Sequence, residues 1–358
     1  MVYNVVVNIS TRYMMKKFLL ILLTIAMAIT LVGCNQQVPT YNAKFWMSYK
    51  VNYQDREYDV PYKSETLTYD VKIGEQLTPG VLTLTFKSYM LGAEEVLSKT
   101  FNPDKDTSSV TSDVIGTQHT YTVNTGDYTL EATLTFESGD MVGDKLYYFC
   151  HMDSAMNPIA SYRELILDYE KTATTSRYGS DQKPLSQVYY TTYNQKATQS
   201  TSVYAVRSAF GSDTYTVGRY EGAYTSQTVD TMQLLYSARS ISTLANGGNV
   251  SAYISIPSPI ENTTKQMSMA TYSQDVAVDK GTYIETSGIL GDSTSINCTA
   301  ISIMLYNETV SGQRLTYYYS NNPLKVSTEE NAPSVGLVPV MMVEDNIVYT
   351  LRSISVVK

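Results

Sequence analysis

The chain has few of the residues that enzymes most often use for catalysis. Its 358 residues include 2 His, 3 Cys and 1 Trp. It has no G-x-S-x-G nucleophile motif, no glycine-rich phosphate loop and no dinucleotide-binding fingerprint. It also lacks the C-x-x-C and H-x-x-x-H pairs from which zinc sites of about four ligands are built. These absences favour a non-enzymatic protein that carries no cofactor.

Clusters of basic residues are absent as well. The net charge is −8, and residues 1–33 hold three basic residues and no acid, which leaves −11 on the remaining 325 residues. An acidic chain without a Lys/Arg patch is a poor candidate for binding nucleic acid or an anionic membrane surface.

One apolar run stands out near the N-terminus. Lys16 and Lys17 precede it, it extends from Phe18 to Thr30, and small residues follow. The run is shorter than the ~20 apolar residues that a membrane-spanning helix needs. A positive start, a short apolar core and a small-residue end are typical of an export signal.

The end of this signal, Leu31-Val32-Gly33-Cys34, resembles the lipobox of bacterial lipoproteins. In that family the signal peptidase recognises the three residues before the cysteine and cleaves there, and the cysteine receives a diacylglycerol and N-terminal acylation. The resemblance implies that Cys34 is the first mature residue and is lipidated. Each buried methylene of an acyl chain contributes ~0.8 kcal/mol, so two or three chains would hold the protein on the extracytoplasmic face of a bacterial cell membrane.

The expected organisation is an export signal over 1–33, a lipidated tether over 34–43 and a single β-rich domain over 44–358. An alternative boundary lies near 154–158. Residues 1–13 add nothing that a signal needs, and we expect translation to start at Met14 or Met15.

Period-two alternation of apolar and polar residues dominates the domain and predicts an antiparallel sheet with one buried face. It is clearest in VLTLTF from Val81, in YTLEATLTFE from Tyr128 and in NVSAYISI from Asn249. NTGD at 124–127 is typical of a hairpin turn. Further strands are expected over 45–54, 65–73, 145–152, 161–170, 186–193, 202–209, 213–220, 267–276, 298–306, 314–320, 337–343 and 347–356.

One segment has helical spacing instead. Apolar and basic residues recur there at three- to four-residue intervals, at Val229, Met232, Leu235 or Tyr236, and Arg239, and Thr228 or Asp230 could cap the start. The pattern predicts one substantial helix over 229–240 in an otherwise all-β fold.

Three segments in order resemble a bacterial cell-envelope domain family of unknown function. They are SETLTYDVKIGEQLTPGVLTLTF from Ser64, DTMQLLYSAR from Asp230, and the C-terminal strands YYYSNNPLK, LVPVMMVE and VYTLRSISV. The resemblance covers roughly 64–356, and it departs where paired acids become Asn321 and Asn322. It implies a large curled antiparallel sheet or half-barrel with the helix on its inner face, similar to half-barrel lipoprotein carriers and envelope lipid-binding proteins.

A few polar residues are candidates for chemistry. His151 and Asp153 share one face of a predicted strand. They could be two metal ligands, or a base and the acid that orients it. The more common explanation for such a pair is a histidine and an acid without a function at the end of a strand. Cys150 and Cys298 could form a disulfide in an exported protein or remain as buried thiols.

Composition and resemblance together leave two functions open. The first is a surface-tethered, non-enzymatic protein that binds an apolar or amphipathic ligand, such as a lipid, in the cell envelope. The second is a structural or interaction module that binds glycan or protein through sheet faces rich in Tyr and Thr, because the chain has 32 Tyr against 7 Phe. A more common reason for such tyrosines is a half-buried sheet surface.

Replacement of Cys34 by serine tests the lipobox. We expect the Cys34→Ser precursor to remain uncleaved and the chain to lose its acyl anchor, because a hydroxyl does not accept the diacylglycerol. Acyl labelling and mass measurement of the N-terminal peptide would check this. Unchanged processing and labelling in the variant, or in cells treated with globomycin, would contradict the prediction.

Overall fold

A computed structural model describes most of the domain. The described residues are 48–53, 56–61, 63–73, 76–89, 96–99, 119–139, 141–167, 186–207, 215–230, 232–240, 251–277, 295–305, 314–327, 329 and 332–357. The chain divides into two units, Met1–Gln37 and Val38–Lys358. The export signal, Cys34 and the tether over 34–43 lie outside the described residues, so they stay predictions.

The described part is an all-β fold with one short α-helix followed by a 3-10 turn, as predicted for its class. The helix, α3, spans Gln233–Ser237, and the turn, η2, spans Ala238–Ser240. The strands are β1 Ser48–Tyr53, β2 Arg56–Pro61, β3 Ser64–Ile73, β4 Gln76–Ser88, β5 Val96–Lys99, β6 His119–Thr122, β7 Tyr128–Phe136, β8 Lys145–Met152, β9 Pro158–Ile166, β10 Gln187–Asn194, β11 Gln199–Arg207, β12 Tyr215–Ala223, β13 Ser251–Ser258, β14 Thr263–Ala277, β15 Ser295–Leu305, β16 Arg314–Ser320, β17 Leu324–Lys325, β18 Ser334–Val335, β19 Pro339–Glu344 and β20 Ile347–Val357.

Fourteen of these strands form one antiparallel sheet that is built from two meanders. Its order is β12-β11-β10-β9-β8-β7-β4-β3-β20-β19-β16-β15-β14-β13. The first meander extends from β3 to β12, and the second returns from β13 to β20. They join where β3 pairs with β20, with Leu67 opposite Ile354. The segment that carries α3 therefore connects the two edge strands of the sheet.

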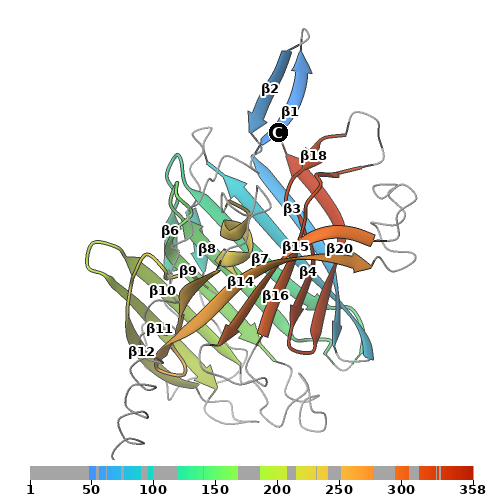
Figure 1. Ribbon diagram of the computed structural model, residues 1–358. Helices are drawn as coiled ribbons and strands as arrows, with labels where there is room; N and C mark the ends of the chain where they lie inside the picture. The colour runs from blue at the N-terminus through green and yellow to red at the C-terminus, as the bar shows by residue number, and fades with distance from the viewer. Residues whose placement is uncertain are drawn as a thin grey trace, which may run out of the picture. The chain divides into compact units, whose positions relative to one another are not determined.

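The sheet curls into a nearly closed barrel, because its two edges approach each other (Figure 1). The Tyr220 hydroxyl on β12 lies 2.5 Å from the Thr264 hydroxyl on β14. Thr228, just after β12, forms a parallel bridge with Ser255 of β13. The predicted antiparallel sheet is confirmed, and it closes further than a half-barrel. Curling in this way shelters two edge strands that would otherwise expose unpaired backbone groups.

Alternation along the strands places the largest core on one face of the sheet, which we call the inner face. Residues of β3, β4 and β7 alternate as predicted: Leu67, Tyr69, Leu82, Leu84, Phe86, Leu130, Ala132, Leu134 and Phe136 are buried there. A second, smaller core covers the opposite face of β8–β12 and includes Phe149, Tyr162, Val188 and Tyr190. Both faces of this half of the sheet are therefore covered.

The predicted hairpin turn differs in the structure. Asn124–Asp127 does form a turn, with Gly126 at φ 96°, but β6 before it pairs with β5 and β7 after it belongs to the large sheet. The Pro-Gly pair at 79–80 lies inside β4. A Cβ on Gly80 would lie 2.8 Å from the Phe136 ring, so the glycine serves close packing across the sheet.

The predicted helix over 229–240 is correctly placed but shorter. Backbone bonds to β13 hold the residues before it: Val229 N–H donates to the Ser255 carbonyl at 2.9 Å, and Ser255 N–H donates to Gln227 at 3.0 Å. The helix begins after Met232, which makes no side-chain cap. Neither Thr228 nor Asp230 caps it, because pairing with the sheet takes precedence over extension of the helix.

An ion pair inside the barrel fixes the end of this helical segment. The Arg239 guanidinium bonds both oxygens of Glu65 on β3, and its second terminal nitrogen also donates to the Gly336 carbonyl at 3.0 Å. Both charged side chains are fully buried. Next to them, the rings of Tyr236 and Phe86 stack at 4.8 Å. The pair joins a helix in the middle of the chain to the first strand of the large sheet.

Most tyrosines with described side chains are buried, which corrects the expectation of a half-buried sheet surface. Their hydroxyls bond across the barrel: Tyr69 donates to the Pro339 carbonyl and Tyr319 to the Leu235 carbonyl, both at 2.8 Å. Tyrosine exceeds phenylalanine in this chain because its ring fills the interior while its hydroxyl satisfies a distant backbone group.

The Glu65–Arg239 pair yields a stability test. We expect Glu65→Met to lower the free energy of unfolding by about 3–5 kcal/mol, because it leaves the Arg239 charge buried without its partner. The double variant Glu65→Met/Arg239→Met should recover most of that loss. Urea unfolding followed by tyrosine fluorescence gives both values.

The matched control is the exposed pair Arg219–Glu221, whose nitrogen and oxygen lie 2.9 Å apart. Arg219→Met should cost less than about 1 kcal/mol. A single variant at Glu65 as stable as the wild type would contradict the structural role of the buried pair.

Candidate functional site

A buried carboxylate ties the start of the helical segment to the first meander. Asp230 accepts hydrogen bonds from the Tyr148 hydroxyl at 2.5 Å, from the Ser161 hydroxyl at 2.7 Å, and from the Tyr193 hydroxyl. Its backbone N–H donates to the Gln233 side chain at 3.1 Å. These three donors come from β8, β9 and β10, so the carboxylate holds three adjacent strands together.

Burial keeps these hydroxyls protonated. The pKa values of Tyr148 and Tyr193 are raised well above the ordinary value, first by burial and then by the Asp230 charge. A protonated hydroxyl is a donor, which is the role that a carboxylate acceptor requires. The cluster is therefore a set of donors around one acceptor, suited to holding the helix in place.

A hollow of about 370 Å³ lies beside α3 on the inner face of the sheet. Met232 and Leu235 of the helical segment contribute to its wall, and strands of both meanders contribute the rest. Most of the lining side chains are apolar: Leu82, Leu134, Leu146, Ile256, Pro257, Pro259, Ile260, Met267, Leu315, Met342 and Val343. Its size falls within the range of about 300–1,000 Å³ that is typical of small-molecule sites.

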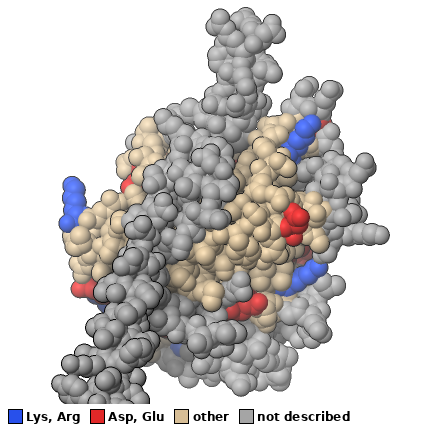
Figure 2. All heavy atoms as spheres, viewed as in Figure 1, with Lys and Arg blue, Asp and Glu red and all other residues tan. Residues whose placement is uncertain are grey.

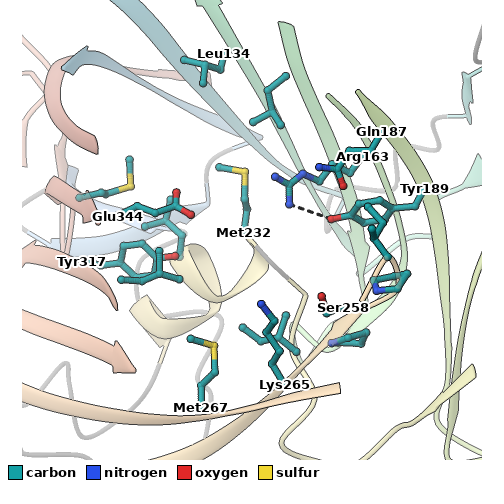
Figure 3. A pocket seen from close by; sticks show the side chains of 18 of the residues that line it. Leu134, Arg163, Gln187, Tyr189, Met232, Ser258, Lys265, Met267, Tyr317 and Glu344 are labelled. Carbon is teal, nitrogen blue, oxygen red and sulfur yellow. Dashed lines mark hydrogen bonds between the residues drawn. The ribbon is translucent and has the colours of Figure 1, made fainter. Parts of the chain in front are cut away.

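Four charged side chains line the same hollow (Figure 3). Lys265 and Glu261 pair with each other at 2.9 Å. Arg163 donates to the Tyr189 hydroxyl at 3.0 Å, and Tyr189 is the main cause of its raised pKa. Glu344 lies on the other side of Met232 from Arg163 in Figure 3. The hollow thus combines an apolar wall with a few placed charges, as an amphipathic ligand requires.

On the face drawn in Figure 2, the Lys and Arg side chains of the described residues lie apart from one another. Within the described ranges, no helix has the length and apolar character needed to cross a bilayer.

His151 and Asp153 do not form a site with each other. His151 Nε2 lies 2.7 Å from a carboxylate oxygen of Asp127, in the turn before β7. Asp153 instead accepts from the backbone N–H groups of Ala155 and Asn157, each at 2.9 Å, and so stabilises the turn between β8 and β9. Among the residues that the structure describes, no group of three or more His, Cys, Asp and Glu could hold a metal ion.

The two cysteines of the domain are free thiols, and both are buried. Burial raises the pKa of Cys150 well above its ordinary value, and it raises that of Cys298 to about 12, with a smaller contribution from Asp275. The disulfide considered from the sequence does not form, and neither thiol is poised as a nucleophile.

Sequence reasoning missed the hollow and its charged residues. The strand predicted over 161–170 contains Arg163, whose even spacing from Ser161 places both on one face. This two-residue spacing could have indicated an inward-facing arginine. It does not specify which residues the arginine side chain would contact. Leu31, Val32, Gly33 and Cys34 lie outside the described residues and remain the predicted lipidation signal.

Comparison with known proteins gives a fold-level similarity. No protein-family model matches the chain, and no curated protein matches it. The chain is similar in structure to a β-barrel-like protein of a domain of unknown function, DUF1849, from Brucella abortus, with a TM-score of 0.41 and 7% identity over 83% of this chain and 99% of the other. The more specific resemblance to a cell-envelope family stays a prediction.

The buried thiols give a test by chemical labelling. We expect Cys150 and Cys298 of the native protein to resist a thiol reagent near neutral pH, because their side chains are inaccessible and burial raises both pKa values, which disfavours the reactive thiolate. Unfolding in urea should release both thiols. Intact-mass measurement counts the labels, and rapid labelling of either residue before unfolding would contradict the packing described here.

Proposed function

We propose that the protein is a lipid-anchored, non-enzymatic binding protein on the extracytoplasmic face of a bacterial cell membrane. Its anchor is the acylated Cys34, and its ligand is an apolar or amphipathic molecule held inside the barrel. It needs no cofactor and does not bind nucleic acid. The binding role and the anchoring are separate parts of this proposal, since one rests on the hollow and the other on the signal sequence.

The observation that carries the binding role is the hollow of about 370 Å³ beside α3, with its apolar wall. A ligand there would replace water against leucine and methionine side chains, and each Å² of apolar surface removed from water is worth about 25 cal/mol. Two residues of its wall, Met232 and Leu235, lie in the chain segment between the hydrogen-bonded anchors Asp230 and Arg239, so this part of the wall is fixed before a ligand enters.

The alternative role, glycan or protein binding through tyrosine-rich sheet faces, has less support in the described strands. Among tyrosines whose burial is described, each is buried or half-buried, so their rings do not form an open stacking platform in these ranges.

A pocket-filling variant tests the binding role. Leu146→Trp adds an indole to the wall of the hollow, and we expect it to lower the amount of co-purifying lipid about ten-fold, equivalent to ~1.4 kcal/mol of affinity. Lipids are extracted from the purified full-length lipoprotein and quantified by mass spectrometry, with native mass spectrometry as the check on stoichiometry.

The matched control is Lys145→Trp, at the adjacent position of the same strand, where the side chain is exposed and the hollow is not reached. It should carry as much lipid as the wild type. Equal lipid in wild type and Leu146→Trp, or a protein that carries none, would contradict the proposed function.

A further inference from the structure

Arg163 lines the hollow, and the contacts that it makes there do not explain why a charged side chain occupies this position. The side chain extends from β9 into a largely apolar wall. Within the described part of the chain it makes one hydrogen bond, to Tyr189, and its buried Nε has no hydrogen-bond partner. The guanidinium also lies over the Tyr189 ring, 5.8 Å from its centre.

An arginine in such a place is costly without an acid to pair with. Transfer of a charged group from water into apolar surroundings is strongly unfavourable unless hydrogen bonds and an opposite charge compensate it. Here a neutral hydroxyl and an aromatic ring supply part of that compensation. The unused Nε, together with a terminal nitrogen beside it, forms the side-on fork that binds two oxygens of a carboxylate or phosphate.

The neighbouring charges leave this role to Arg163. Lys265 is neutralised by Glu261 at 2.9 Å. Glu344 contributes to the raised pKa of Arg163 through its charge, yet it lies across the hollow beyond Met232 (Figure 3). Asp230, which accepts from the Ser161 hydroxyl on the same strand, is the second acid whose charge raises the pKa of Arg163. An anion bound at Arg163 would therefore meet one cation directly and two acids that do not pair with it.

We propose that Arg163 anchors the head group of a single-chain anionic amphiphile, such as a fatty acid or an alkyl phosphate, whose tail lies against Leu82, Leu134 and Leu146. This rests on the proposed function and names the class of ligand. The volume of about 370 Å³ is near the lower end of the usual range of about 300–1,000 Å³ and suits one acyl chain.

The test compares three probes that share one tail: dodecanoate, dodecyl phosphate and dodecanol. The full mature lipoprotein is held in phosphatidylcholine nanodiscs, and uptake of each labelled probe is measured by equilibrium dialysis against empty discs, at a pH where the carboxylate is ionised. We expect Arg163→Gln to weaken the binding of dodecanoate or of dodecyl phosphate by about ten- to hundred-fold, as for the loss of a charged hydrogen bond. The binding of dodecanol should change little.

Further variants separate charge from folding. Arg163→Lys should retain part of the affinity, because it keeps the charge but loses the fork. Glu344→Gln should strengthen anion binding, because it removes the opposing charge. Arg219→Gln, on the exposed part of β12, should match the wild type. The melting temperature of each variant identifies any loss of folding.

The outcomes are distinct. Selective loss of one anionic probe supports the proposal and tells carboxylate from phosphate. If Arg163→Gln weakened the binding of dodecanol as much as that of the anions, or left the binding of the anions unchanged, the proposal would be overturned. The protein would then be a binding protein for neutral ligands. Failure of the proposed function itself would show as a wild type that takes up none of the three probes.

Discussion

The buried pair of Glu65 and Arg239 is the constraint on which the arrangement of the barrel depends. Two charges removed from water gain little net stability from their attraction, and an apolar pair of equal volume is often as stable. What the pair does supply is position, because an unpaired charge in the core is so unfavourable that other placements of the helical segment are excluded. Arg239 must reach Glu65, and its bond to Gly336 brings the second meander to the same point.

Asp230 gives the helical segment a second fixed point, nine residues earlier in the chain. Its oxygens accept hydrogen bonds from hydroxyls on three strands of the first meander, whereas Arg239 contacts β3 and the loop before β19. A short helix has little stability of its own, since helices of this length are marginal in water. Here tertiary polar contacts at both ends replace that missing stability, and the side chains between them, Met232 and Leu235, are held as part of the wall of the hollow.

The sequence predicted most strands because alternation is a local property, and Leu82, Leu84 and Phe86 show it without any knowledge of their neighbours. Four features depend on contacts distant in sequence and were beyond that reasoning. Glu65 and Arg239 are separated by 174 positions, and nothing local marks them as partners. The helix is short because β13 competes for the residues before it, and the tyrosines face inward because their acceptors belong to other strands. Closure of the sheet likewise depends on Tyr220 and Thr264.

The shortness of the helix bears directly on function. An eight-stranded barrel is about filled by its own side chains, and wider barrels leave interior space. Among the described residues, the fourteen strands, one five-residue helix and a 3-10 turn leave a hollow of about 370 Å³, even with large tyrosines extending inward. A helix of about three turns, as the sequence pattern predicts, would occupy more of that interior. Because pairing with β13 delays the start of the helix, the space beside Met232 stays open, and Arg163, whose Nε has no partner, contributes to its wall. The same backbone bonds that bring the two sheet edges together therefore also create the hollow.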